Sequence, residues 1–152
     1  KNVGLVLQAY LKRTAADVDR AIELGARVRL CKGAYNESPA IAYKSMPRIR
    51  EQFMECARRL LQYGNYPGIA THDRELIAAV MEFAAAKGIA RDRFEFQMLY
   101  GIRPQVQRDL VKQGYRLRVY IPFGTHWAGY FYRRVAERRE NLLFALSSVF
   151  SR

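Results

Sequence analysis

Residues 26–35 combine cationic side chains with a glycine in a pattern that suits an anion or an electron-rich ring as ligand. Alternating side chains predict a strand in which apolar Val28 faces one side and Arg29 faces the other. The alternation ends at Lys32 and Gly33, and glycine permits backbone conformations that larger residues resist. Cations and backbone N–H groups would therefore meet at the end of this strand. A strand end with solvated charges is an equally good interpretation of this stretch alone.

The ends of three further predicted strands also carry polar groups. Thr71 and His72 follow the third strand, Gln97 lies near the end of the fourth, and Tyr120 lies near the end of the fifth. His72 could act as a base or a ligand, although a lone histidine is more often a hydrogen-bonded structural residue. The sequence contains no Ser/His/Asp set, no HExxH, no phosphate loop and no GxGxxG, and we expect no metal site.

Arg133 and Arg134 form a pair of cations one helical turn after Tyr130. Residues three apart share a helix face, so Tyr130 and Arg133 would be neighbours, with Arg134 alongside. Two guanidinium groups in this arrangement would suit a carboxylate ligand. A solvated helix end explains the same spacing equally well.

Alternating helices and strands must position these groups. Four helices are predicted to stop at a glycine and to be followed by a strand, at Gly25, Gly64, Gly88 and Gly114. Thr14 with Asp17 resembles a capping box, and Asp73 can cap the helix that follows it. Strands are predicted over 3–10, 27–31, 68–71, 94–98 and 117–122, and two further helices from about 128 and over 141–150. The strict alternation favours parallel βα units.

One face of four predicted strands is polar, whereas strands of parallel sheets usually read as continuous apolar runs. Its polar residues are Gln8, Arg29, Glu95, Gln97, Arg118 and Tyr120. If the sheet curls into a βα barrel, this face points inward. We expect a set of residues at the carboxyl edge, where the active sites of such barrels lie: Arg29, Thr71, Gln97 and Tyr120. A buried salt bridge between Glu95 and Arg118 would explain only the lower part of the face.

Composition limits the class of protein without choosing one function. The 152 residues are enough for one domain with a sizeable core, which we assign to 1–152. Two cysteines without CxxC spacing favour a reduced compartment, and no apolar run is long enough to span a membrane. The net charge of +12 would attract nucleic acid, an anionic membrane surface or acidic ligands. A nucleic-acid-binding module would present aromatic residues among exposed cations, whereas these aromatics mostly occupy predicted core positions.

Five motifs resemble those of the flavin-dependent proline dehydrogenases. They are RLCKGAY at 29–35, ATHD at 70–73, EFQMLYG at 95–101, RVYIPFG at 118–124 and YFYRR at 130–134. They occur in the order of the family along essentially the whole chain. The resemblance implies a distorted (βα)₈ barrel that holds FAD and oxidises L-proline to Δ1-pyrroline-5-carboxylate. It also implies that electrons pass from FAD to a membrane quinone.

The resemblance implies roles for individual residues. Arg29 would lie near the flavin N5, where the negative charge gained on reduction needs a cation. Further FAD contacts would come from Gln8, Lys32, Gly33, Ala34, Tyr35, Thr71, His72 and Gln97. Arg133 and Arg134 would bind the proline carboxylate, and the proline ring would be packed by Leu99, Tyr120 and Tyr130. Tyr120 would also crowd a 4-hydroxyl group and so favour proline over hydroxyproline. The residues expected to take part in catalysis are Arg29, Tyr120, Arg133 and Arg134.

Two residues depart from the pattern of the family. Asp73 stands where the family commonly has Asn, which adds a negative charge close to the proposed adenosine side. Cys31 replaces the more usual Val, a milder change.

The resemblance covers only part of the barrel. It corresponds to the fourth to eighth strands, about five strands, and the C-terminal helices. The N-terminal half, with the active-site lysine and aspartate of the family, has no counterpart, and the chain opens without Met inside a predicted strand. We therefore expect a segment of a longer enzyme that lies in the cytoplasm, peripheral to the inner membrane. A non-catalytic half-barrel is the alternative.

Overall fold

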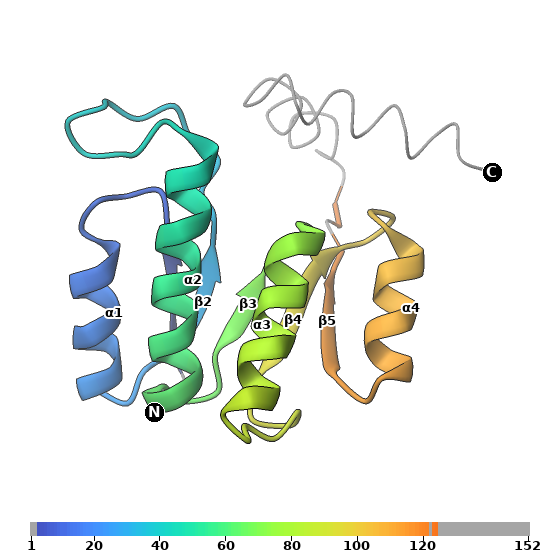
Figure 1. Cartoon of the computed structure of the whole chain (residues 1–152). Coiled ribbons are helices and arrows are strands. Elements are labelled where there is room, and N and C mark those ends of the chain that lie inside the picture. The colour runs from blue at the N-terminus through green and yellow to red at the C-terminus, as the bar shows by residue number, and fades with distance from the viewer. Residues whose placement is uncertain (1–2, 122, 125–152) are drawn as a thin grey trace.

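The computed structural model describes residues 3–121 and 123–124, which form five strands alternating with four helices (Figure 1). The elements in chain order are β1 (Gly4–Gln8), α1 (Thr14–Glu23), β2 (Arg27–Cys31), α2 (Met46–Tyr63), β3 (Gly68–Ala70), α3 (Arg74–Ala86), β4 (Glu95–Leu99), α4 (Pro104–Lys112) and β5 (Arg116–Tyr120). All five predicted strands are present, with ends that differ by at most two residues from those predicted. The two helices predicted from about 128 and over 141–150 lie outside the described residues.

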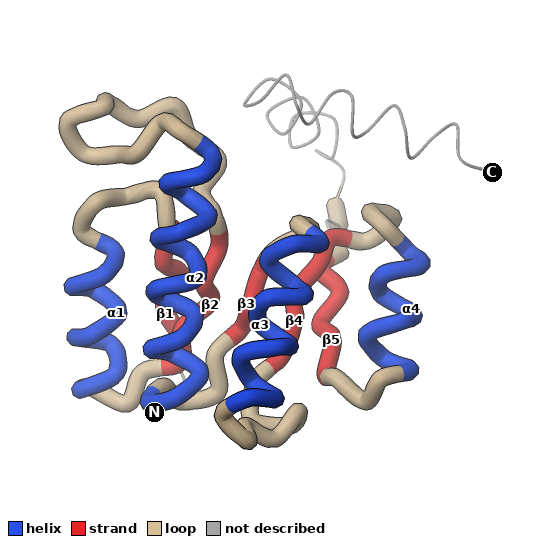
Figure 2. The backbone as a smooth tube through the Cα atoms, viewed as in Figure 1, coloured by secondary structure: helices blue, strands red, loops and turns tan. Residues whose placement is uncertain are grey.

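The strands form one parallel sheet in which neighbours in space are also neighbours in the chain. The order is β1-β2-β3-β4-β5, and each adjacent pair is parallel. The helices lie on one side of the sheet, in front of the strands in Figures 1 and 2. A parallel sheet built in chain order with its helices on one face is the arrangement of a (βα) barrel. The prediction of parallel βα units is therefore confirmed.

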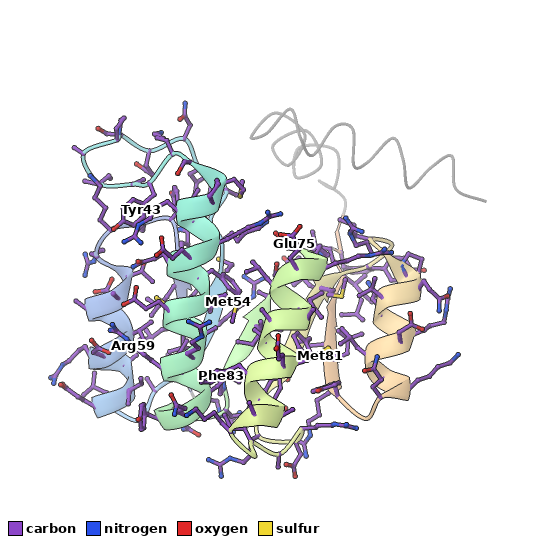
Figure 3. All side chains as sticks on the ribbon, in the orientation of Figure 1. Tyr43, Met54, Arg59, Glu75, Met81 and Phe83 are labelled. Atoms are coloured by element: carbon purple, nitrogen blue, oxygen red, sulfur yellow. The ribbon has the colours of Figure 1, made fainter. Side chains whose placement is uncertain are left out.

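The core lies between the helices and the sheet. Leu30 of β2, Phe53 of α2 and Phe96 of β4 are completely buried there. Each such side chain contributes about 1.5–3 kcal/mol by leaving water. Met54 of α2 and Phe83 of α3 can be located in Figure 3, on the helices that cover the middle of the sheet. Apolar residues at strand positions facing the helices thus hold the sheet in place.

The opposite face of the sheet carries the polar residues, as alternation predicts. Paired residues of parallel strands lie side by side, and Arg29 pairs in register with Gly68, which pairs with Glu95. The next row toward the carboxyl edge contains Gln97 and Arg118, which are also paired in register. No described helix covers this face, and it is the face that would point into a barrel.

The start of α1 differs from the prediction of a capping box. Arg13 occupies the N-cap position, without a side-chain cap, and its Nε lies 2.7 Å from Asp17 Oδ2. The Thr14 hydroxyl instead donates to the backbone oxygen of Gln8 at 2.6 Å. This hydrogen bond holds the start of α1 against the end of β1, and the Thr14 hydroxyl is therefore not available to cap the helix. The predicted cap of α3 is confirmed, because Asp73 Oδ1 accepts from the backbone N–H of Glu75.

The two outer strands have a partner on one side only within the described part of the chain. Val6 of β1 is 59% exposed, and Tyr120 of β5 is 51% exposed. The row of unpaired N–H and C=O groups along such a strand is open to pairing with another strand. Among residues 3–121, 123 and 124, no helix has the length and hydropathy needed to cross a membrane.

Candidate functional site

The loop after β2 begins with a close contact that requires glycine. Gly33 has a φ of +106°, and a Cβ at this position would lie 2.1 Å from Cδ1 of the Tyr10 ring. The backbone N–H of Tyr10 donates to the oxygen of Lys32 at 2.8 Å, and the Tyr43 N–H donates to the oxygen of Tyr10 at 2.8 Å. These contacts fix the backbone of Lys32 and Gly33 at the carboxyl edge of the sheet.

Asp73 gathers cations at the same edge. Its Oδ2 accepts from Lys32 Nζ at 3.1 Å and from Arg50 Nε at 2.8 Å. Arg50 Nη1 also lies 2.9 Å from Oε2 of Glu75, which is labelled near the top of α3 in Figure 3. Burial alone would raise the pKa of the Asp73 carboxyl, but the hydrogen bonds and charges of Lys32 and Arg50 outweigh it and place that pKa below its ordinary value. The residue that departs from the family pattern therefore holds the lysine proposed to contact FAD.

His72 is held as a neutral, hydrogen-bonded side chain. Its Nε2 accepts from the backbone N–H of Leu99 at 2.8 Å, so the neutral ring carries its proton on Nδ1. Burial, followed by the nearby charges of Arg103, Lys32 and Arg29, lowers its pKa to about 4. Because Nε2 already accepts from Leu99, His72 can orient the end of β4, and its Nδ1–H can donate to a further group. Of the two roles left open by the sequence, the structural one agrees with this geometry.

A chain of hydrogen bonds crosses the polar face from β2 to β5. Arg29 Nε donates to Gln97 Oε1 at 2.7 Å, and Gln97 Nε2 donates to Glu95 Oε1 at 2.6 Å. Arg118 donates to both oxygens of Glu95, at 2.6 and 3.0 Å, and Tyr66 donates to Glu95 Oε2 at 3.2 Å. The salt bridge between Glu95 and Arg118, considered from the sequence as the structural alternative for the lower part of this face, is present, and the hydrogen bonds continue from it through Gln97 to Arg29.

The lower part of this face is hollowed. A cavity of about 250 Å³ is lined by residues of β1 to β5 and of the loop before β3, among them Arg29, Glu95 and Arg118. Burial alone would raise the pKa of the Glu95 carboxyl, but hydrogen bonds from Arg118, Gln97 and Tyr66 place it below its ordinary value. The cavity wall therefore carries cations and a buried, ionised carboxylate.

The predicted site residues do not all lie at one level. Arg29 lies two residues before the end of β2, level with Glu95, which corrects its predicted place at the carboxyl edge. The strand continues past Arg29 because Cys31 still pairs with Ala70. Gln97 also lies two residues before the end of its strand, β4, but is level with Ala70, the last residue of β3. Tyr120, paired in register with Leu99, does lie at the carboxyl end.

The remaining predicted contacts surround this edge. Gln8 ends β1, Thr71 follows β3 with its hydroxyl accepting from the Asp73 N–H at 3.1 Å, and Ala34 and Tyr35 continue the loop after Gly33. Arg133, Arg134 and Tyr130 lie outside the described residues. Arg50 and Tyr66 are functional contacts that the sequence did not indicate. Arg50 lies on α2, where no motif was recognised, and no motif contains Tyr66.

A family model described as proline dehydrogenase matches residues 1–145, nearly the whole chain. The chain belongs to the proline dehydrogenase family. Proline dehydrogenase 2 of Bacillus subtilis (strain 168) is 47% identical over 149 residues, which are 98% of this chain and 49% of that protein. The proline dehydrogenase of Deinococcus radiodurans is 42% identical over 98% of this chain and 48% of its own length. The chain thus spans about half the length of these two proline dehydrogenases.

Solved structures of larger proline dehydrogenase relatives have the same fold. Proline utilization A (PutA) from Bdellovibrio bacteriovorus, inactivated by N-propargylglycine, matches with a TM-score of 0.78 and 31% identity over 88% of this chain and 16% of that one. PutA from Bradyrhizobium japonicum (mutant D779Y) matches with a TM-score of 0.77 and 28% identity over 90% of this chain and 16% of that one. The parallel sheet described here is therefore that of a proline dehydrogenase domain.

Proposed function

We propose that this chain is the second half of a proline dehydrogenase barrel, corresponding to the fourth to eighth strands. In this proposal residues 1–152 form a single partial-barrel domain of a longer enzyme. It is supported by the sequential strand order, by the helices on one face, and by two outer strands that have a partner on one side only among the residues that the structure describes. The missing strands would pair with β1 and β5 and cover the polar face, which no described helix covers.

The reaction proposed for the complete barrel is the FAD-dependent oxidation of L-proline to Δ1-pyrroline-5-carboxylate. The observation that carries this proposal is the polar face of the strands, where hydrogen bonds hold the cations and the amide of Gln97 in place. The family model matches the chain over residues 1–145. FAD, when bound, supplies the two-electron acceptor for this chemistry. A quinone would be the final acceptor, and the enzyme would act in the cytoplasm, peripheral to the inner membrane.

The donor set on the described residues fits such a cofactor. Lys32 and Arg50 place two cationic side chains at this edge, where Asp73 and Glu75 accept from them, and the Lys32 ammonium group has further N–H donors that suit a diphosphate. Arg29 donates from Nε to a neutral amide and keeps its charge available for a group that gains electrons. Gly33 keeps the loop backbone close to Tyr10, without a side chain above it.

Each group has a role in the proposed mechanism. Arg29 would stabilise the negative charge that the flavin gains at N5, and Gln97 orients Arg29. The other contacts proposed to hold FAD are Gln8, Lys32, Gly33, Ala34, Tyr35, Thr71 and His72. Arg133 and Arg134 bind the proline carboxylate, while Leu99, Tyr120 and Tyr130 pack against its ring. These residues would together orient proline relative to the bound flavin, and orientation of this kind lowers the barrier of a reaction between two bound groups.

An absorption spectrum and a turnover assay test this function in the natural-length protein that contains the sequence. The expected result is a flavin band in the purified protein and reduction of a dye that depends on proline. A protein that reconstitutes with FAD but leaves proline unchanged would contradict the proposed substrate. A protein that takes up no FAD would contradict the cofactor.

A further inference from the structure

The buried carboxylate of Glu95 is connected to Arg29 through a single side chain, although the two residues make no direct ion pair. We propose that Glu95 is a positioning residue that holds the Arg29 guanidinium in place through the amide of Gln97. This inference rests on the proposed function, because it supposes that Arg29 faces a bound flavin.

The chemistry of the three groups allows only one orientation of the amide. A guanidinium can only donate hydrogen bonds, and an ionised carboxylate can only accept them. The amide of Gln97 must therefore direct Oε1 at Arg29, at 2.7 Å, and Nε2 at Glu95, at 2.6 Å. If the carboxylate were absent, the amide could turn its NH₂ group toward Arg29, and this hydrogen bond would be lost.

Glu95 is well suited to serve as a fixed point. Its side chain is 8% exposed, and it accepts two hydrogen bonds from Arg118 and one from Tyr66 besides that of Gln97. Four donors thus occupy its two oxygens, which matches the capacity of a carboxylate. The bidentate pair of Arg118 with Glu95 has a defined geometry, so it fixes the position of the carboxylate. The carboxylate in turn fixes the amide of Gln97, which donates to it.

The backbone of β3 leaves room for the amide. Gly68 lies between Arg29 and Glu95 in the register of the sheet, and a Cβ there would lie 2.4 Å from Gln97 Nε2. Any other residue at this position would displace the amide from its place beside Glu95. The absence of a side chain at Gly68 is therefore part of the arrangement.

The amide orients Arg29 without neutralising it. Arg118 is the guanidinium that pairs with the Glu95 carboxylate, whereas Arg29 receives a neutral acceptor. A cation fixed in this way stabilises negative charge at the group it faces, because no carboxylate of the described residues forms an ion pair with it. Loss of the orientation should therefore make the bound flavin harder to reduce.

The test measures the two-electron potential of the flavin in the natural-length protein, with Glu95 changed to Gln. The new side chain has nearly the same volume as Glu, but its single amide oxygen cannot accept from all four donors. The hydrogen bonds that run from position 95 through Gln97 to Arg29 therefore lose their fixed order. We expect a roughly tenfold loss in the equilibrium constant for reduction, which is about 30 mV toward negative potential for a two-electron couple. The kcat should fall while the KM for proline stays unchanged, because Glu95 makes no proposed contact with the substrate.

A double-mutant cycle separates positioning from a general structural role. In a Gln97→Met background the route from Glu95 to Arg29 is already broken, so Glu95→Gln should shift the potential no further. If Glu95→Gln prevents folding, the paired change Glu95→Leu with Arg118→Met replaces the ion pair by apolar side chains, which is often neutral for stability. This pair should shift the potential as Glu95→Gln does. Asp19→Asn, at a carboxylate paired with Arg59 on the outer helices, is the matched control and should leave the potential unchanged.

The outcomes distinguish this inference from the proposed function. A wild-type protein that binds no flavin would overturn both. A wild-type protein that oxidises proline, with an unchanged potential in the Glu95 variants, would overturn the positioning role alone. The same conclusion would follow if Glu95→Gln shifted the potential equally with and without Gln97.

Discussion

Lys32 Nζ lies 3.1 Å from Asp73 Oδ2, and this ion pair joins the loop after β2 to the N-terminus of α3. The same oxygen accepts from Arg50 of α2. One buried carboxylate therefore connects three segments that are distant in the chain, at the edge where the cofactor is proposed to bind.

Replacing Asp73 by Asn should destabilise the protein by about 1.5–3 kcal/mol, the typical contribution of hydrogen bonds to charged groups. Asn can still cap α3, so the loss would report on the contacts with Lys32 and Arg50. Urea unfolding measures the change. Asp19→Asn is the control, because its exposed pair with Arg59 should contribute only about 0–1 kcal/mol. Equal effects of the two changes would contradict a special role for Asp73.

The stability should fall between pH 7 and pH 5 because of His72. Its pKa of about 4 in the folded state lies below the unfolded value of about 6.5, so the unfolded chain binds the proton first and gains free energy as the pH falls. The expected loss over this interval is about 2 kcal/mol. His72→Gln, whose amide oxygen can still accept from the Leu99 N–H, should flatten the pH profile. Parallel profiles for the two proteins would show that another group is responsible.

Gly33→Ala should destabilise the protein more than Gly25→Ala does. Both glycines have positive φ, and the backbone cost of such a conformation is about 1–2 kcal/mol for a residue with a Cβ. At Gly25 the added methyl would meet open space, whereas at Gly33 it would overlap the buried ring of Tyr10. Thermal unfolding of the two variants provides the comparison. A smaller effect at Gly33 would mean that Tyr10 moves aside easily.

Much of this arrangement was predictable because strand periodicity is a local property. The side of the sheet taken by Val28 and Arg29 follows from alternation, and the pairing of Glu95 with Arg118 was recognised as a possible salt bridge. Arg29 was placed too close to the carboxyl edge although the predicted strand 27–31 has the bounds of β2, in which Arg29 lies two residues before the end. Arg50 lies on a helix and meets Asp73 only through tertiary packing, and no spacing in the sequence indicates this contact.

Replacing Arg133 or Arg134 by Met in the natural-length protein should weaken proline binding while FAD stays bound. Loss of one charge-assisted hydrogen bond corresponds to about 1.5–3 kcal/mol, or roughly ten- to a hundredfold in affinity. Titration with proline, followed by the flavin spectrum, measures the change. Normal affinity for proline in either variant would remove that arginine from the proposed carboxylate site.

The 152-residue chain by itself should have little or no proline dehydrogenase activity. A closed (βα)₈ barrel takes eight strands, typically over ~250 residues, and the described part of this chain supplies five. The expressed chain would be reconstituted with FAD and assayed for proline-dependent dye reduction. Turnover comparable to that of a full-length enzyme would show that half of the barrel is sufficient.

The strand order of the sheet also bears on how the protein folds during synthesis. Each strand from β2 to β5 pairs with the strand made just before it, so no described strand has to wait for a partner that emerges much later. Each pairing spans one βα unit, so its loop-closure entropy is limited to that unit, although parallel pairing is still slower than the formation of a hairpin. A ribosome would thus release a sheet that grows by one βα unit at a time, with its newest strand always the edge that accepts the next.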